Sequence, residues 1–239
     1  MVEQLYTRDE MKEIIKAYDT LVLGIDKLAE DNVDGRAYGG IVRAGKGELV
    51  ESITKILVKL AWERLGEKAN RLIITRIPTK IPIKKGYVEQ LEDEYVKSHI
   101  KKNLKDYFYK YKSDVLVLVD NKPVLEIECK AYTENAMLKR ILVDATLVKT
   151  IHPDVSFVLM QLESQLGGDY SNLNTKTLGS TSTHTLLSYF DIHLHIITLL
   201  KGERKVDKPI HKKEFFKPLT KESLEMAIDS IKSILEKYK

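Results

Sequence analysis

Residues 113–130 combine two β-favouring segments with charged side chains whose types and spacing could support chemistry. Residues 114–119 read Asp-Val-Leu-Val-Leu-Val, and residues 124–130 read Val-Leu-Glu-Ile-Glu-Cys-Lys. Because side chains alternate across a strand, Glu126, Glu128 and Lys130 are expected on one face and the apolar residues between them on the other. Charges on an otherwise apolar strand must be paired or must bind a metal.

The intervening segment Asp120-Asn121-Lys122-Pro123 predicts a tight turn, so the two strands should pair. Asp114 would then lie near Glu128 and Lys130. Carboxylate oxygens suit Mg²⁺, a bound metal lowers the pKa of its water, and a lysine stabilises negative charge on a phosphate. The pattern therefore predicts metal-dependent hydrolysis of a phosphodiester, with Glu126 as a possible outer ligand. The alternative is a solvated hairpin with ordinary cross-strand charge pairs.

This stretch resembles the PD-(D/E)xK nuclease superfamily, in which an acidic residue at a strand start is followed by acidic-any-lysine on the next strand. Ser113 stands where the superfamily usually has proline. The resemblance implies that Asp114 and Glu128 ligate Mg²⁺ and that Lys130 positions or activates the attacking water. It covers about residues 110–160.

Within that superfamily, the length of 239 residues favours a type II restriction endonuclease. Such enzymes usually cut double-stranded DNA as homodimers on palindromic sites. A DNA repair or Holliday-junction-type nuclease of the same superfamily is an alternative. A catalytically silent DNA-binding module that keeps the fold is another.

Hydrophobic periodicity predicts an α/β fold with a mixed central β-sheet flanked by helices, as in the core of restriction endonucleases. Helices are expected over 8–31, 47–65, 88–110, 133–150 and 221–239. Besides the strand pair, strands are expected after residue 71 and over 155–162 and 192–200, with loops over 32–47 and 164–185. We expect one nuclease domain over 1–239, with a catalytic core over about 45–200 and helical additions at both ends.

Glu48 is a candidate third catalytic and metal-binding carboxylate, because it lies in the first turn of the predicted 47–65 helix. The resemblance implies this role, since related nucleases often bring a glutamate from an N-terminal helix to the metal. A carboxylate at that position is also favoured by the helix dipole alone. Glu51 lies further along the polar face and ranks second.

Several polar and basic segments are candidates for DNA contact, although each is also compatible with an ordinary solvated surface. The glycine-rich segment 32–47 offers Arg43 and Lys46, and the proline-broken segment after residue 75 offers Lys80, Lys84 and Lys85. The helix after the strand pair offers Lys139 and Arg140. The 164–185 loop offers Asn172, Asn174, Lys176, Ser180, Thr181, Ser182, Thr183 and His184.

Composition excludes several other classes of protein. The net charge of +4 permits a polyanionic partner without requiring one. A single cysteine excludes an intramolecular disulfide and a cysteine zinc cage, and no apolar run approaches 18 residues, so a cytoplasmic protein is expected. Residues 40–47 nearly match a phosphate-binding loop but lack its final hydroxyl. His193 and His195 are too few for a catalytic zinc site.

Overall fold

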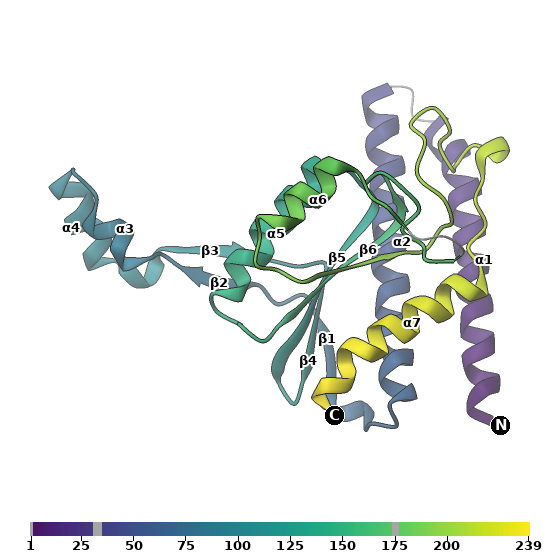
Figure 1. Cartoon of the computed structure of the whole chain (residues 1–239), viewed down its shortest axis with the longest axis horizontal. Helices are drawn as coiled ribbons and strands as arrows, with labels where there is room; N and C mark the ends of the chain where they lie inside the picture. The colour runs from purple at the N-terminus through teal and green to yellow at the C-terminus, as the bar shows by residue number, and fades with distance from the viewer. Residues whose placement is uncertain (1, 31–34, 174–176) are drawn as a thin grey trace.

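The computed structural model describes residues 2–30, 35–173 and 177–239, and the side chains of 2–9, 25–30 and 35–43 lie outside that description. Its centre is a five-stranded sheet in the order β1-β4-β5-β6-β7 (Figure 1). Strands β1 (Leu72–Thr75), β4 (Val115–Val119) and β5 (Lys122–Thr133) are antiparallel neighbours. Strands β6 (Ser156–Ser164) and β7 (Leu194–Thr198) continue the sheet in parallel with β5. The predicted mixed central sheet is confirmed.

The β4–β5 hairpin forms where the sequence predicts it. A two-residue loop joins the strands, and both Asp120 and Asn121 have positive φ values, of 50° and 63°. Short polar residues tolerate this left-handed conformation, and a loop of this kind matches the twist of the two strands. The loop fixes the register, so Val115 pairs with Ile127 and Asp114 lies just before that pair.

Helices cover both faces of the sheet. On one face lie α2 (Gly35–Arg64) and α7 (Lys221–Leu235), with α1 (Val2–Glu30) packed beside them (Figure 1). The other face carries α5 (Asn135–Lys149) and α6 (Thr181–Ser188). None of the helices in the described ranges is long and apolar enough to cross a membrane.

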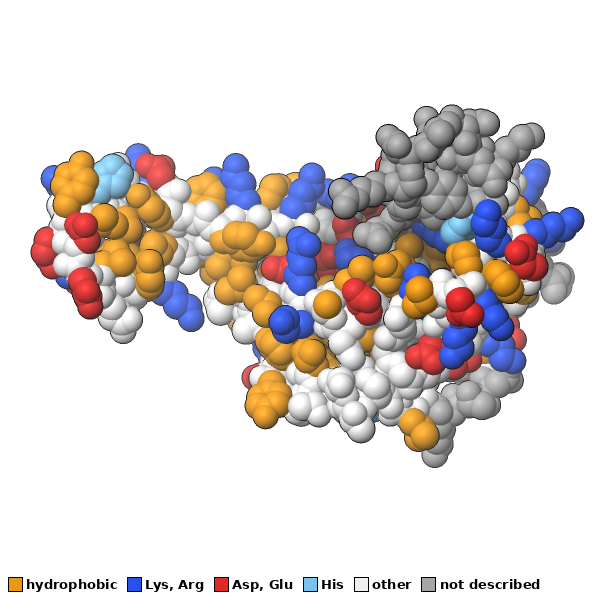
Figure 2. Space-filling view, turned by 90° about the horizontal axis from the view of Figure 1, so that it is seen from above, with side chains coloured by type: hydrophobic (Ala, Val, Ile, Leu, Met, Phe, Trp, Pro, Cys, Tyr) orange, Lys and Arg blue, Asp and Glu red, His pale blue; other side chains and the backbone are white. Residues whose placement is uncertain are grey.

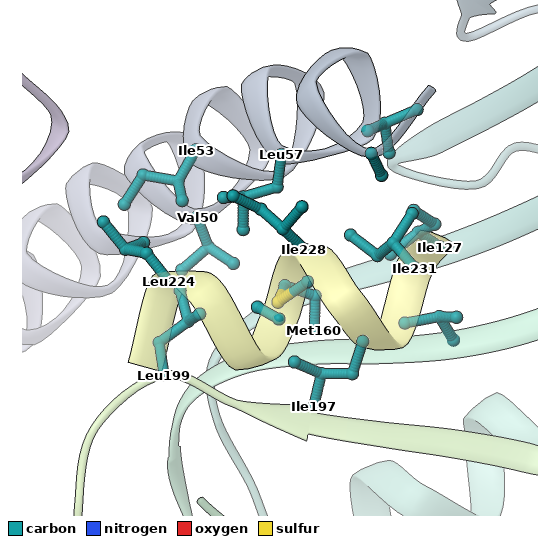
Figure 3. Close-up of a cluster of buried hydrophobic side chains, with 14 of the residues drawn as sticks. Val50, Ile53, Leu57, Ile127, Met160, Ile197, Leu199, Leu224, Ile228 and Ile231 are labelled. Carbon is teal, nitrogen blue, oxygen red and sulfur yellow. The ribbon is translucent and has the colours of Figure 1, made fainter. Parts of the chain in front are cut away.

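The main core lies between the sheet and the α2–α7 pair (Figure 3). Helix α2 contributes Val50 and Leu57, α7 contributes Ile228, and the facing strands contribute Ile127 and Met160. Each of these side chains is at most 2 % exposed. Burying one such side chain stabilises the fold by about 1.5–3 kcal/mol. This core holds α2 firmly against β5, the strand that carries Glu128 and Lys130.

The predicted loop over 32–47 is wrong, because α2 already begins at Gly35. Glycine costs a helix only about 1 kcal/mol relative to alanine, and no proline interrupts this segment. The strong apolar stripe that follows therefore extends into a helix of 30 residues. Arg43 and Lys46 consequently lie on a helix and not on a loop.

The predicted helix over 88–110 is also wrong. Residues 85–111 form α3 (Lys85–Glu89), α4 (Glu94–Lys102), a short 3-10 turn and then strand β3 (Phe108–Tyr111). A continuous helix over 88–110 is interrupted at Asp93. The Asp93 side chain accepts hydrogen bonds from the N–H groups of Tyr95 and Val96 and so caps the start of α4. The β-favouring aromatic residues after Asp106 pair with β2.

Strand β2 (Thr79–Pro82) occupies the segment predicted as a lysine-rich connection, and it pairs with β3 in a separate two-stranded ribbon. Residues 76–112, which we call the arm, project away from the central sheet with α3 and α4 at their end (Figure 1). The predicted loop over 164–185 ends early, because Ser180 caps α6 through the N–H of Thr183.

Candidate active site

Asp114 is held at the start of β4 by the neighbouring strand. Its Oδ2 accepts a hydrogen bond of 2.8 Å from the backbone N–H of Cys129 and one of 2.9 Å from Lys130 Nζ. The side chain is 24 % exposed, so it is shielded yet open to a ligand on one side. The hairpin register therefore brings together the residues that the sequence singled out.

Glu128 and Lys130 lie two residues apart on the same face of β5. Lys130 Nζ is 2.7 Å from Glu128 Oε2, and Tyr111 at the end of the arm donates a hydrogen bond of 2.8 Å to Glu128 Oε1. Burial alone would lower the pKa of Lys130, but the charges of Glu128 and Asp114 together raise it above its ordinary value. Lys130 is thus a fixed cation between two carboxylates.

The intervening Cys129 faces the opposite side of the sheet. Its Sγ lies 3.4 Å from Thr54 Oγ1 of α2, and burial raises the pKa of the thiol to about 12. A thiol that stays protonated is a poor nucleophile. The geometry therefore favours the carboxylate–lysine group over cysteine chemistry.

Arg76 connects the hairpin to α2. One guanidinium nitrogen lies 3.6 Å from Asp114 Oδ1, and the other lies 3.1 Å from Glu51 Oε2. Lys55 Nζ is 2.7 Å from the other oxygen of Glu51. Glu51 is therefore linked to the site through one ion-paired arginine. Glu48 lies one turn earlier and is exposed, and its backbone carbonyl accepts a hydrogen bond from the Ser52 hydroxyl.

Glu126 is a buried carboxylate beside this group. It is 3 % exposed, and neither of its oxygens has a hydrogen-bond partner among the described residues. Burial raises its pKa to about 7, the charge of Glu128 adds to the rise, and the nearby Ser113 and Thr79 offset part of it. An unpaired buried carboxylate costs several kcal/mol unless it takes up a proton or a cation.

The oxygen atoms present fit a hard divalent cation. Mg²⁺ is usually held by one or two carboxylates together with water and substrate phosphate oxygens, and it needs no complete protein cage. Asp114 and Glu128 supply that number of carboxylates, and Glu126 has spare oxygens on the same strand face. Within the described residues, no group of three or more His, Cys, Asp or Glu side chains forms a ready-made metal cage.

A curated relative decides which family this arrangement belongs to. The chain is 49 % identical over 233 residues to the type II restriction enzyme DdeI of Desulfomicrobium norvegicum (strain DSM 1741 / NCIMB 8310), covering 96 % of this chain and 97 % of the relative. The chain belongs to the type II restriction enzymes. The predicted identity as a type II site-specific deoxyribonuclease is thereby confirmed. Such enzymes generally need a divalent metal.

Two further comparisons add little to this assignment. No family model matches the chain. Among solved structures, the native BbvCI A2B2 tetramer is 12 % identical with a TM-score of 0.37, covering 98 % of this chain and 90 % of that chain. A likeness this distant carries no argument about the restriction enzyme's site or assembly.

The basic residues proposed for DNA contact lie in different environments. Lys80, Lys84, Lys85, Lys139 and Arg140 are all exposed, the first three on the arm and the last two on α5. The side chain of Arg43 lies outside the described residues. Lys46 is 8 % exposed and lies 3.2 Å from His211 Nδ1, and burial lowers its pKa to about 8. Lys46 is therefore placed in the interior of the restriction enzyme.

The polar residues proposed for DNA contact in the 164–185 segment also lie in different environments. Asn174 and Lys176 lie outside the described residues, and Asn172 is an exposed residue with a φ of 59°. Thr183 is fully buried, and its hydroxyl contacts Ser180, Asn135 and the carbonyl of Leu166, so it has no free group for a base. The exposed or half-exposed members on or beside α6 are Ser180, Thr181, Ser182 and His184.

Three residues that touch the site gave little or no signal in the sequence. Arg76 and Tyr111 lie at the two ends of the arm, where neither charge nor spacing distinguishes them from their neighbours. Asp144 of α5 is a third, because its carboxylate lies close enough to Lys130 and Tyr109 for both to affect its pKa. Burial nevertheless leaves the pKa of Asp144 above its ordinary value.

We expect Glu126→Gln to stabilise the metal-free protein, and more so at high pH. The folded state holds the Glu126 proton up to about pH 7, whereas an ordinary glutamate loses it near 4.5. The wild type therefore loses stability as pH rises through this window, by about 3 kcal/mol in total. Glutamine keeps the shape without the charge, so it should remove most of this loss.

Denaturant unfolding in metal-chelating buffer at pH 5 and pH 8 measures this effect as the difference between wild type and variant. The exposed Glu63→Gln serves as the matched control and should change neither value. An equal stabilisation by Glu126→Gln at both pH values would mean that Glu126 does not titrate in this window.

Proposed function

We propose that this restriction enzyme is a Mg²⁺-dependent member of the PD-(D/E)xK superfamily, with Asp114 and Glu128 as metal ligands and Lys130 beside the attacking water. The observation that carries the proposal is the position of Lys130 Nζ, which is 2.9 Å from Asp114 Oδ2 and 2.7 Å from Glu128 Oε2. Two carboxylates and a lysine that share one face are the groups that this hydrolysis requires.

In the proposed reaction, a water oxygen forms a bond to phosphorus while the bond from phosphorus to the 3′ oxygen breaks. The attacking water releases one proton to solvent and the leaving 3′ oxygen takes one up from solvent, so the products are a 5′-phosphate and a 3′-hydroxyl. A bound Mg²⁺ would supply Lewis acidity and lower the pKa of its water. Lys130 holds positive charge where negative charge develops on the phosphate, and Asp114 and Glu128 keep that ammonium in place.

A third carboxylate from α2 completes the proposed site. Glu48 and Glu51 both belong to this helix and lie three residues apart, so they share a side of it. The ion pair between Arg76 and Glu51, and the contact of Arg76 with Asp114, favour Glu51. This proposal reverses the ranking expected from the sequence, so Glu48 becomes the candidate of lower rank.

We further propose that the enzyme acts as a homodimer on double-stranded DNA, since two-fold symmetry in the protein matches a palindromic site. The exposed residues Lys84, Lys85, Lys139 and Arg140 are proposed phosphate contacts, and Asn172 and the polar residues of α6 are proposed base contacts. The division into a core over about 45–200 with helical additions, and the cytoplasmic location, remain predictions.

Digestion of a sequenced plasmid tests the proposed function. With Mg²⁺ we expect discrete fragments whose mapped ends share one sequence, and no cleavage when a chelator removes the metal. Light scattering on the purified protein gives the oligomeric state. Cleavage of branched DNA in preference to the plasmid would contradict the proposal and favour the repair-type alternative. A protein that binds DNA but does not cleave it with any divalent metal would favour the catalytically silent DNA-binding module.

A further inference from the structure

The arm carries an excess of positive charge that the rest of the molecule lacks. Residues 76–112 contain ten Lys and Arg against five Asp and Glu, a net charge of +5, whereas the whole chain carries +4. Four of the five acidic residues fall within 89–94, around α3 and the start of α4. The β2–β3 ribbon itself holds only positive charges, and blue side chains follow the arm in Figure 2.

Two lysines face each other directly on this ribbon. Lys80 of β2 pairs with Lys110 of β3 in the antiparallel register, and both side chains are exposed. Like charges directly opposite each other destabilise a sheet. Neither lysine forms an ion pair with any described residue, so no acidic side chain of the described chain offsets the repulsion.

Both ammonium groups lie near the ring of Phe108. Lys80 Nζ lies 4.5 Å from the centre of its ring, and Lys110 Nζ lies 5.8 Å from it. The ring face attracts both cations and so holds them on one side of the ribbon. We call Lys80, Phe108 and Lys110 the lysine clamp.

The opposite face of the ribbon fixes the clamp relative to the active site. Ile81 and Tyr111 are buried in a cluster with Ala145 and Val148 of α5. Tyr111 follows Lys110 directly, and its hydroxyl donates a hydrogen bond to the Glu128 carboxylate. The clamp therefore lies one residue from a side chain that touches the proposed metal ligand.

We propose that the lysine clamp binds a backbone phosphate of duplex DNA outside the active site, and that the arm extends the DNA contact beyond the cut. This inference rests on the proposed function of the active site. An anionic phosphate placed between Lys80 and Lys110 removes their mutual repulsion and gains two charge-assisted contacts. The arm thus supplies affinity that does not depend on base sequence.

The test compares wild type with the double variant Lys80→Ala/Lys110→Ala in metal-chelating buffer, so that binding is measured without cleavage. Fluorescence anisotropy with a labelled duplex of about 30 base pairs gives the Kd at several salt concentrations. The slope of log K against log salt scales with the number of neutralised phosphates, so loss of this one phosphate contact should lower it by about 1. The affinity should fall about tenfold near physiological salt.

Two controls make this result specific. Lys80→Arg/Lys110→Arg keeps both charges and should restore the slope, and Lys122→Ala removes an exposed lysine at the β4–β5 turn and should leave it unchanged. An unchanged slope in the alanine double variant would overturn the inference. Loss of dimers at an unchanged slope would also overturn it and would assign the ribbon to contact with a second copy.

Different results would refute the proposed clamp and the proposed active site. A wild-type protein that cuts DNA, together with a double variant that binds DNA normally, refutes the clamp alone. A wild-type protein that never cuts, but whose salt slope falls in the double variant, refutes the proposed chemistry and leaves the clamp supported. Both lysines are exposed, so the double variant should fold, and its thermal unfolding temperature should match that of the wild type.

Discussion

Lys130→Ala is expected to reduce DNA cleavage by about 10³-fold while leaving DNA binding nearly unchanged. The ammonium is the only positive group within hydrogen-bond distance of both Asp114 and Glu128 among the described residues. Without it, the charge that develops on the phosphate loses the ammonium group that stabilises it beside the attacking water. Single-turnover cleavage of a plasmid at saturating Mg²⁺ gives the rate, and gel retardation without metal gives the affinity.

Asp114→Asn separates a chemical effect from a folding defect. The amide oxygen can still accept the hydrogen bond from the Cys129 N–H, so the hairpin should keep its register. The lost negative charge should nevertheless lower cleavage to the level of Lys130→Ala. Lys122→Ala, on the strand β5 that also carries Lys130, is the matched control for Lys130→Ala and should cut normally. A Lys130→Ala protein that cut DNA at the wild-type rate would remove Lys130 from the mechanism.

The hairpin could be predicted because its determinants are local. Two β-favouring runs lie on either side of a two-residue loop of Asp120 and Asn121, and strand alternation then dictates which side chains share a face. Asp114, Glu128 and Lys130 meet as a direct consequence of that register. The mixed sheet followed from equally local strand and helix patterns.

The arm was missed because its fold depends on contacts between distant segments. The lysines after Pro78 read as a solvated connection, and their pairing with Phe108–Tyr111 joins residues about 30 positions apart. Lys110 gave no signal alone, since it is one lysine within a run of aromatic residues. Only the register shows that it faces Lys80 across the ribbon.

The burial of Glu126 was equally hidden from the sequence. Alternation places it with Glu128 and Lys130, but it cannot tell how much of that face other segments cover. In the structure Glu126 is 3 % exposed, whereas the side chain of Lys130 is 30 % exposed. Thr79 of the arm strand β2 lies near enough to affect the pKa of Glu126, so the arm shares this end of the strand face. The surroundings of Glu126 therefore include a residue of the arm.

Glu51→Gln is expected to lower cleavage by about 10²-fold and to raise the Mg²⁺ concentration required for half-maximal rate. Glu51 is ion-paired with Arg76, which in turn contacts Asp114, so its charge acts directly beside a proposed metal ligand. Glu48→Gln is the matched comparison on the same helix, and its exposed position predicts a nearly normal rate. Cleavage rates measured over a Mg²⁺ titration distinguish the two variants.

Arg76→Gln shows how Glu51 acts. If Glu51 only holds Arg76 in place, this variant should reproduce the rate loss of Glu51→Gln without the change in Mg²⁺ dependence. If Glu51 itself binds Mg²⁺, the Mg²⁺ concentration required for half-maximal rate should change in Glu51→Gln alone. A large loss in Glu48→Gln with a normal Glu51→Gln would reverse this ranking, because it would place the third carboxylate one helical turn nearer the start of α2.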